Sequence, residues 1–228
     1  WVLLVHSRFI LNDRLEWEEK VEKLFGVGSK PNDRKGRIVI ATQVVEQSLD
    51  VDFDFMVTDL APIDLIIQRS GRLQRHDRGD RGKPTLGVAM PRLEDGADKY
   101  WYKNMFPKGA AVYSEHGKLW LTARWIEKNR KFRPAMDSRK MVEYVYGEEE
   151  RERIPKDLLY TEDKVQTEKK CESEIGKFNG LNWEDGYAPS CNKWEEDVFA
   201  PTRLGEQTVT LRLGKIIENE LLPLIGEK

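Results

Sequence analysis

The sequence has few residues that could build a metal site, a disulfide framework or a membrane anchor. Its 228 residues include two cysteines and three histidines, so at most one disulfide can form and no metal-ligand spacing is recognisable. Its longest apolar runs, such as Leu60–Ile67, are far too short to span a bilayer. The N-terminus lacks the pattern of a signal peptide, so nothing indicates secretion. We expect reduced, structural thiols, no metal site and no membrane partner.

The charge is balanced overall but is sorted along the chain. A net charge of −2 does not favour nucleic-acid binding, although a local basic patch is sufficient for it. The segment from Arg69 to Lys83 contains six basic residues and two acidic ones, whereas Glu148–Glu152 and Glu195–Asp197 are acidic. We therefore look for function near the basic segment.

Apolar strands alternate with amphipathic helices over the first 91 residues. The order is β-α-β-loop-β-α, which predicts an α/β fold with a parallel sheet flanked by helices and with functional groups at the carboxyl ends of its strands. We expect the strands to be buried on both faces. The predicted strands are Val2–Val5, Arg37–Thr42, Phe55–Asp59 and Leu86–Met90, and the predicted helices are Leu15–Phe25 and Leu65–Leu73.

The composition changes beyond about Pro91, where tryptophans and charged helical segments become frequent. A mixed, largely helical C-terminal extension is expected over residues 92–207, between a first domain of residues 1–91 and the start of a further region at 208–228. Within these parts we predict strands over Lys118–Thr122 and Thr208–Leu213 and helices over Ser138–Tyr146 and Asp163–Phe178.

Five tryptophans of the extension raise the question of base stacking, which tolerates any sequence of single-stranded DNA. Trp120 and Trp125 have apolar neighbours, and we expect them to be core residues. Trp183 and Trp194 have polar neighbours, so their role stays open.

The strongest chemical pattern is the segment from Gln68 to Arg75. Gln68, Arg72 and Arg75 are spaced i, i+4 and i+7, which would place them on one helix face. Phosphoryl transfer needs fixed positive donors, and arginine supplies a planar, permanently charged fork, so Arg72 and Arg75 are candidate arginine fingers. Gly71 would let the backbone approach closely, and Gln68 would bond a water or the terminal phosphate. The alternative is an ordinary solvated basic face.

A second polar cluster follows the strand that ends near Thr42. A hydroxyl at a strand end can hold a nucleic-acid phosphate, and the carboxylate of Asp50 can accept a hydrogen bond from a ribose hydroxyl. Each residue alone is equally compatible with a turn or a cap. The segments occur in a set order, with a strand and Thr42 first, then Asp50, then the Gln68 segment. This order restricts the possible interpretations much more than any single segment does.

These segments resemble superfamily 2 helicases, with Ala41–Asp50 similar to their motif V and Gln68–Arg75 similar to their motif VI. The residues at His6–Phe9, Ala41–Asp50 and Asp59–Asp64 resemble the corresponding segments of the CRISPR-associated helicase-nuclease of type I interference systems. The resemblance continues downstream through Leu119–Thr122, Val142–Tyr146 and Pro201–Glu206, and it implies a second RecA-like lobe with the region that follows it.

The family resemblance also implies site residues and partners. Gln68, Arg72 and Arg75 would face ATP, with Gly71 and Asp50 beside it. Thr42 and Gln43 would contact single-stranded DNA, and Ser7 and Arg8 at another strand end would contact its phosphates, although a structural salt bridge is an equal alternative for Arg8. The parent protein would move 3′ to 5′ along DNA in the prokaryotic cytoplasm, recruited by an RNA-guided surveillance complex, and a metal-dependent HD nuclease domain would cut that DNA in antiviral defence.

The sequence departs from the family in what it lacks. It has no Gly-rich phosphate loop, no acidic Mg²⁺ motif and no HD dyad, so ATP and Mg²⁺ would be bound mainly by a first lobe and the nuclease metals by an HD domain. We expect this chain alone to be inactive and to work with that lobe, the HD domain and a C-terminal domain. Two alternatives remain: a regulatory DNA- or protein-binding module, or a nuclease-free superfamily 2 translocase.

Overall fold

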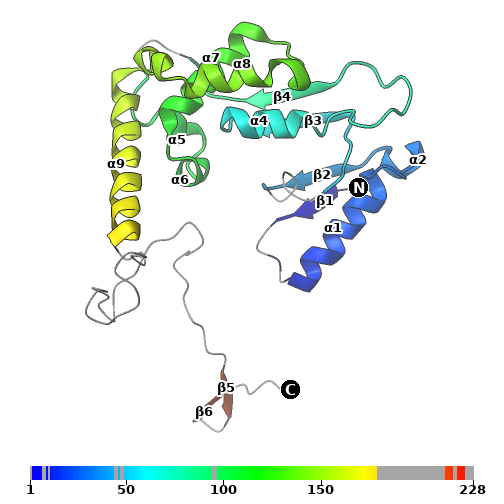
Figure 1. The fold of residues 1–228 in the computed structure, drawn as a ribbon. Coiled ribbons are helices and arrows are strands. Elements are labelled where there is room, and N and C mark those ends of the chain that lie inside the picture. Colours follow the sequence, from blue (N-terminus) through cyan, green and yellow to red (C-terminus); the bar gives the residue numbers. More distant parts are fainter. Residues whose placement is uncertain are drawn as a thin grey trace, which may run out of the picture. The chain divides into compact units, whose positions relative to one another are not determined.

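A computed structural model shows an α/β chain in which helices outnumber short parallel strands (Figure 1). The chain forms two compact units, residues 1–165 and 166–228. In the second unit, the described residues form the end of helix α9 (Lys156–Phe178) and an antiparallel pair of strands, β5 (Gly214–Ile217) and β6 (Glu220–Pro223). The structure describes residues 2–6, 9, 11–43, 46, 49–93, 97–178, 214–217 and 220–223.

The first strand pair joins β1 (Val2–Val5) to β2 (Ile38–Ala41) in parallel, across helices α1 (Leu11–Phe25) and α2 (Pro31–Arg34). Among the described residues, one face of this pair is covered, because α1 packs against Leu3 and Val5 and forms a small core with them. Val2 and Leu4 point the other way and are 57% and 48% exposed. The expectation of strands buried on both faces is therefore wrong for this pair.

The second strand pair joins β3 (Phe55–Asp59) to β4 (Thr85–Ala89), again in parallel, with α4 (Ile63–Ser70) between them in the chain. The strands thus form two separate parallel pairs instead of the one continuous sheet that the sequence suggested. The α/β class and the parallel pairing are confirmed, and the predicted bounds of β1 and β3 match residue for residue.

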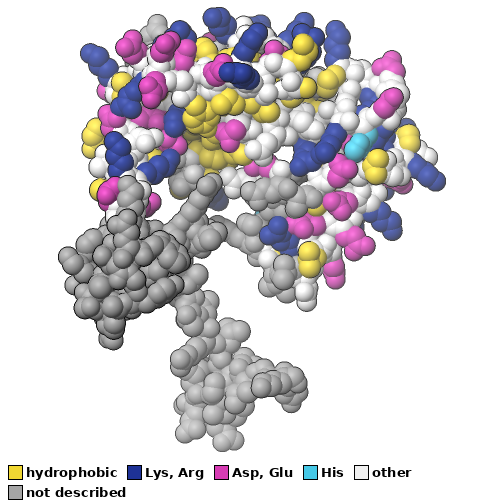
Figure 2. Space-filling model, viewed as in Figure 1, with side chains coloured by type: hydrophobic (Ala, Val, Ile, Leu, Met, Phe, Trp, Pro, Cys, Tyr) yellow, Lys and Arg dark blue, Asp and Glu magenta, His cyan; other side chains and the backbone are white. Residues whose placement is uncertain are grey.

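The larger core lies between α4 and the helices that follow β4. These helices are α5 (Trp101–Met105), α6 (Gly109–Val112), α7 (His116–Asn129), α8 (Pro134–Tyr146) and the 3-10 helix η1 (Glu148–Arg153). Leu60 and Ile63 are fully buried in the same cluster as Leu119 and Met141, so α4 and the extension share one core. Figure 2 shows further hydrophobic side chains gathered over the region of α4 and α5, with charges of both signs elsewhere on the visible face.

The helix α7 overturns one prediction, because Lys118–Thr122 lies inside it and is not a strand. All residues from Leu119 to Ala123 are buried, so the segment has no polar stripe that would mark a helix in the sequence. Trp120 and Trp125 are buried in the core, as expected. The helices predicted at Ser138–Tyr146 and Asp163–Phe178 are confirmed within α8 and α9, which begin earlier. The predicted strand Thr208–Leu213 and the tryptophans Trp183 and Trp194 lie outside the described residues.

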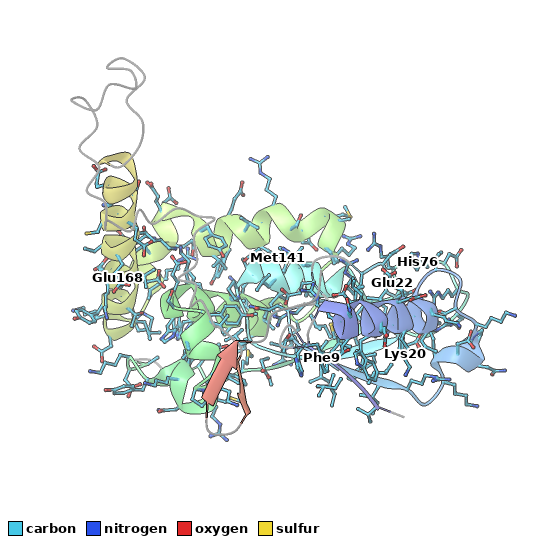
Figure 3. All side chains as sticks on the ribbon, turned by 90° about the horizontal axis from the view of Figure 1, so that it is seen from below. Phe9, Lys20, Glu22, His76, Met141 and Glu168 are labelled. Carbon is cyan, nitrogen blue, oxygen red and sulfur yellow. The ribbon has the colours of Figure 1, made fainter. Side chains whose placement is uncertain are left out.

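Two methionines on α8 test the position of this core. Met141 is fully buried (Figure 3) and Met136 is 64% exposed on the same helix. We predict that Met141→Ala lowers the free energy of unfolding by about 3 kcal/mol, because it leaves a cavity. Met136→Ala should change it by less than about 0.5 kcal/mol. Urea unfolding followed by tryptophan fluorescence measures both, and equal effects would contradict this placement of α8.

Candidate functional site

The arginine-rich segment after α4 runs beside residues 51–54 and is not helical. The Phe53 N–H donates to the Arg72 carbonyl (2.9 Å), and the Gln74 N–H donates to the Phe53 carbonyl (3.0 Å). Gln74 has a left-handed backbone with φ 46°. Because α4 ends at Ser70 and Gly71 caps it, the expectation that Gln68, Arg72 and Arg75 share one helix face is wrong. Backbone pairing with Phe53 replaces the next helical turn.

The anchor of this segment is Asp52, whose side chain has no exposed surface. Its two oxygens accept the backbone N–H groups of Arg75 and His76, each at 3.1 Å. The Arg81 guanidinium donates to both oxygens at 3.1 Å, and Arg78 Nε lies 3.2 Å from Oδ2. A buried carboxylate is tolerated only with such partners, so Asp52 fixes the backbone immediately beside Arg75.

The surroundings of Asp52 determine its pKa. Burial alone would raise the pKa, but the hydrogen bonds from Arg81 and from the His76 amide, with the charges of Arg81 and Arg78, lower it below the ordinary 3.8. A lowered pKa means that Asp52 contributes its full stability at pH values above 3.8. That contribution is lost only as the pH falls through the lower value of the folded protein.

Two residues predicted at the ATP site, Arg75 and Asp50, come together here, and His76 joins them. Arg75 Nη1 lies 3.3 Å from Asp50 Oδ1, and His76 Nε2 lies 3.4 Å from the same oxygen. The backbone N–H of Asp50 donates to Glu22 Oε1 of α1 at 3.3 Å, so Asp50 contacts both Glu22 and His76, which are labelled in Figure 3. The Asp50 side chain remains 54% exposed, so its carboxylate is accessible from solvent.

Arg72 completes this group and is bound differently from the neighbouring arginines. Its Nη2 donates to the backbone carbonyl of Glu46 at 3.1 Å, which is an uncharged acceptor. Burial and the positive charge of Arg75 lower the pKa of Arg72, and Asp50 opposes this shift. The charges of Arg72 and Arg75 therefore repel each other, and the Asp50 carboxylate partly offsets this repulsion.

The predicted DNA contacts lie at the end of β2. Thr42 directly follows the strand, its N–H donates to the Val5 carbonyl at 3.2 Å, and its side chain is exposed. Gln43 is also exposed, and its Nε2 donates to the Tyr113 hydroxyl at 3.2 Å. Ser7 and Arg8 lie outside the described residues.

The last two predicted residues lie at the C-terminal end of α4. Gln68 is on the helix with an exposed side chain. Gly71 has an ordinary φ of −68°, so it does not need glycine's conformational freedom. A Cβ at Gly71 would lie only 3.3 Å from the Gln68 carbonyl oxygen, which explains why a small residue fits this close approach.

Sequence reasoning assigned no role to several residues that organise the site. Asp52 and Glu46 are buried acids, and Arg69 and Tyr113 form hydrogen bonds between distant parts of the chain. A carboxylate between the apolar residues Val51 and Phe53 was a usable signal, because a buried acid needs a partner. The identity of that partner, some 26 to 29 residues away, is set by the fold.

Known proteins share this arrangement of segments. A family model for the C-terminal part of the CRISPR-associated nuclease/helicase Cas3 matches residues 1–78. The CRISPR-associated endonuclease/helicase Cas3 of Escherichia coli is 36% identical over 91% of this chain, and that of Thermus thermophilus is 33% identical over 92%. This chain belongs to the Cas3 family and corresponds to part of a Cas3 protein. It spans 22% and 24% of the length of those two relatives.

Solved Cas3 structures contain the same fold. The T. fusca Cas3–AMPPNP crystal structure matches with a TM-score of 0.61 and 29% identity, over 77% of this chain and 19% of that one. A chain of a CRISPR RNA-guided surveillance complex, in a pre-nicking state, matches with a TM-score of 0.54 and 28% identity, over 74% and 20%. The fold is thus that of a Cas3 helicase region.

Two further findings concern only the part of the chain that the structure describes. There, no three histidine, cysteine, aspartate or glutamate side chains are grouped so as to hold a metal ion. No described helix has both the length and the apolar character needed to cross a bilayer.

The role of Asp52 is testable against its neighbour Asp54. Asp54 Oδ1 also accepts from Arg81 (3.1 Å), but its side chain is 53% exposed. We predict that Asp52→Asn speeds hydrogen exchange in residues 75–82 on the order of 100-fold, because breaking a buried ion pair is costly. Asp54→Asn should change exchange only a few-fold, since an exposed pair contributes little. Mass spectrometry of peptides covering 75–82 measures this, and equal exchange in the two variants would show that Asp52 is not the anchor.

Proposed function

We propose that this chain is part of an ATP-dependent translocase that moves 3′ to 5′ along single-stranded DNA. The observation that carries the proposal is the group of Arg72, Arg75 and Asp50, two guanidiniums beside an accessible carboxylate. Arginines are suited to contact the charge that develops on a transferred phosphoryl group, and Asp50 is suited to a ribose hydroxyl. The nucleotide-bound T. fusca relative supports a nucleotide as the ligand.

The charges around the site favour Arg72 as the main contact with the phosphates. Arg69 is paired with the carboxylate of Glu46, and Arg78 and Arg81 are paired with that of Asp52. Arg72 instead bonds a carbonyl, so its positive charge is least neutralised at short range. Arg75 pairs with the carboxylate of Asp50, which is exposed, so water screens this pair. Gln68 and Gly71 would border the same nucleotide from the end of α4.

DNA would follow the carboxyl ends of β1 and β2, where Thr42 and Gln43 are exposed and where Ser7 and Arg8 lie in the sequence. ATP and Mg²⁺ would be held mainly by a first RecA-like lobe, and nuclease metal ions by an HD domain that degrades the foreign DNA. The surveillance complex among the similar structures supports an RNA-guided complex as the recruiting partner, in the cytoplasm of a prokaryote. Without the first lobe and the HD domain, this chain would neither hydrolyse ATP nor cut DNA.

The arginine roles are tested in the full-length protein that carries this chain. We predict that Arg72→Ala and Arg75→Ala each lower single-strand-DNA-stimulated ATP hydrolysis by a factor on the order of 10³. Each change removes a positive donor that the transition state needs, while folding and DNA binding stay intact. Arg139→Ala is the matched control, because its side chain on α8 is 87% exposed and pairs only with Glu143 among the described contacts.

A coupled phosphate assay with saturating DNA measures the loss. Hydrolysis in both arginine variants at the level of Arg139→Ala would mean that the segment after α4 is an ordinary basic surface and that the translocase proposal is wrong for this site.

A further inference from the structure

Tyr113 lies between the predicted DNA contact and the basic segment, although it belongs to the extension. Its hydroxyl accepts a hydrogen bond from Gln43 Nε2 at 3.2 Å and another from Arg69 Nη2 at 3.1 Å. A phenol oxygen accepts two such bonds through its two lone pairs. Gln43 and Arg69 lie 26 positions apart, in the segments similar to motifs V and VI. The Tyr113 oxygen, 44 positions beyond Arg69, bonds to both of them.

Arg69 is held rigidly by what surrounds it. Its Nε donates to Glu46 Oε1 at 2.7 Å, and its Nη1 donates to Thr58 Oγ1 at 2.5 Å and to the Asp59 carbonyl at 3.2 Å. The side chain is only 15% exposed. Because the guanidinium is planar and bonded on three sides, any shift of Tyr113 must be accommodated by Arg69 as a unit.

Glu46 continues the connection to the proposed ATP contact. Glu46 is 9% exposed. Its carboxylate binds Arg69, and its backbone carbonyl accepts a hydrogen bond from Arg72 Nη2 at 3.1 Å. The Glu46 N–H also donates to the Gln43 carbonyl at 3.0 Å. Gln43 and Arg72 are thus connected both through this hydrogen bond and through Tyr113, Arg69 and Glu46.

We infer that the Tyr113 hydroxyl and the Glu46 carboxylate are positioning groups that make the placement of Arg72 depend on DNA bound at Gln43. This rests on the proposed function. When DNA takes over the Gln43 amide, Tyr113 keeps Arg69 as a donor, and a shift of Tyr113 moves Arg69 and its partner Glu46, whose carbonyl orients Arg72. The connection is a contiguous chain of hydrogen bonds, which is the kind of path that can carry coupling between two sites.

The test removes one oxygen from the chain. Tyr113→Phe in the full-length protein keeps the ring and deletes both hydrogen bonds, and Tyr160→Phe on α9, where the tyrosine is 69% exposed, is the matched control. ATP hydrolysis is measured without DNA and with saturating oligothymidylate, together with the Kd of the oligonucleotide and the Tm. We expect the ratio of stimulated to basal hydrolysis to fall roughly fivefold or more in Tyr113→Phe, with basal rate, Kd and Tm unchanged.

A second variant addresses the other end of the chain. Glu46→Gln keeps the backbone carbonyl that Arg72 uses and weakens only the charged pair with Arg69. It should lower the same ratio in the same direction, and the double variant should be no worse than the more affected single variant, because both act on one path.

The outcomes are distinct. An unchanged ratio in Tyr113→Phe overturns the inference, and so does a weaker Kd with full stimulation at saturating DNA, since Tyr113 would then serve binding alone. If the wild-type protein shows no DNA-stimulated hydrolysis, the proposed function itself is wrong, and the inference fails with it.

Discussion

The geometry of the whole site depends on the buried carboxylate of Asp52. A carboxylate without solvent is stable only when donors surround it, and here two backbone amides and two guanidiniums do so. Because the amides belong to residues 75 and 76, the burial of Asp52 and the backbone position of Arg75 depend on the same atoms. Folding around Asp52 therefore fixes the backbone beside Arg75, where we propose the contact with phosphate.

The extension contributes to this site as well as to stability. Its helices share a core with α4, which places Tyr113 against Arg69 and Gln43. Tyr146 of α8 also donates to Asp64 of α4 at 2.9 Å. Motifs that are read as a helicase signature thus receive part of their support from a region with no recognised motif. A change in that region can therefore remove hydrogen bonds of Gln43 and Arg69 without touching either residue.

The sequence predicted the short apolar strands well, because β-branched runs such as Val2–Val5 bounded by polar residues have few alternatives. It failed for Lys118–Thr122, because the residues from Leu119 to Ala123 are all buried and the helical periodicity disappears. The order of the motifs predicted that Asp50 would lie near Arg72 and Arg75. The prediction placed both arginines on one helix, whereas they follow the end of that helix. Asp52 and Tyr113 could not be assigned, because their partners are determined by tertiary contacts.

The left-handed turn at Gln74 separates Arg72 from Arg75 and gives each its own support. Arg72 takes its orientation from the Glu46 carbonyl, whereas Arg75 takes its own from Asp50 and from the amide held by Asp52. The two guanidiniums are therefore supported by different parts of the chain. A substitution that removes the support of one of them leaves the support of the other in place.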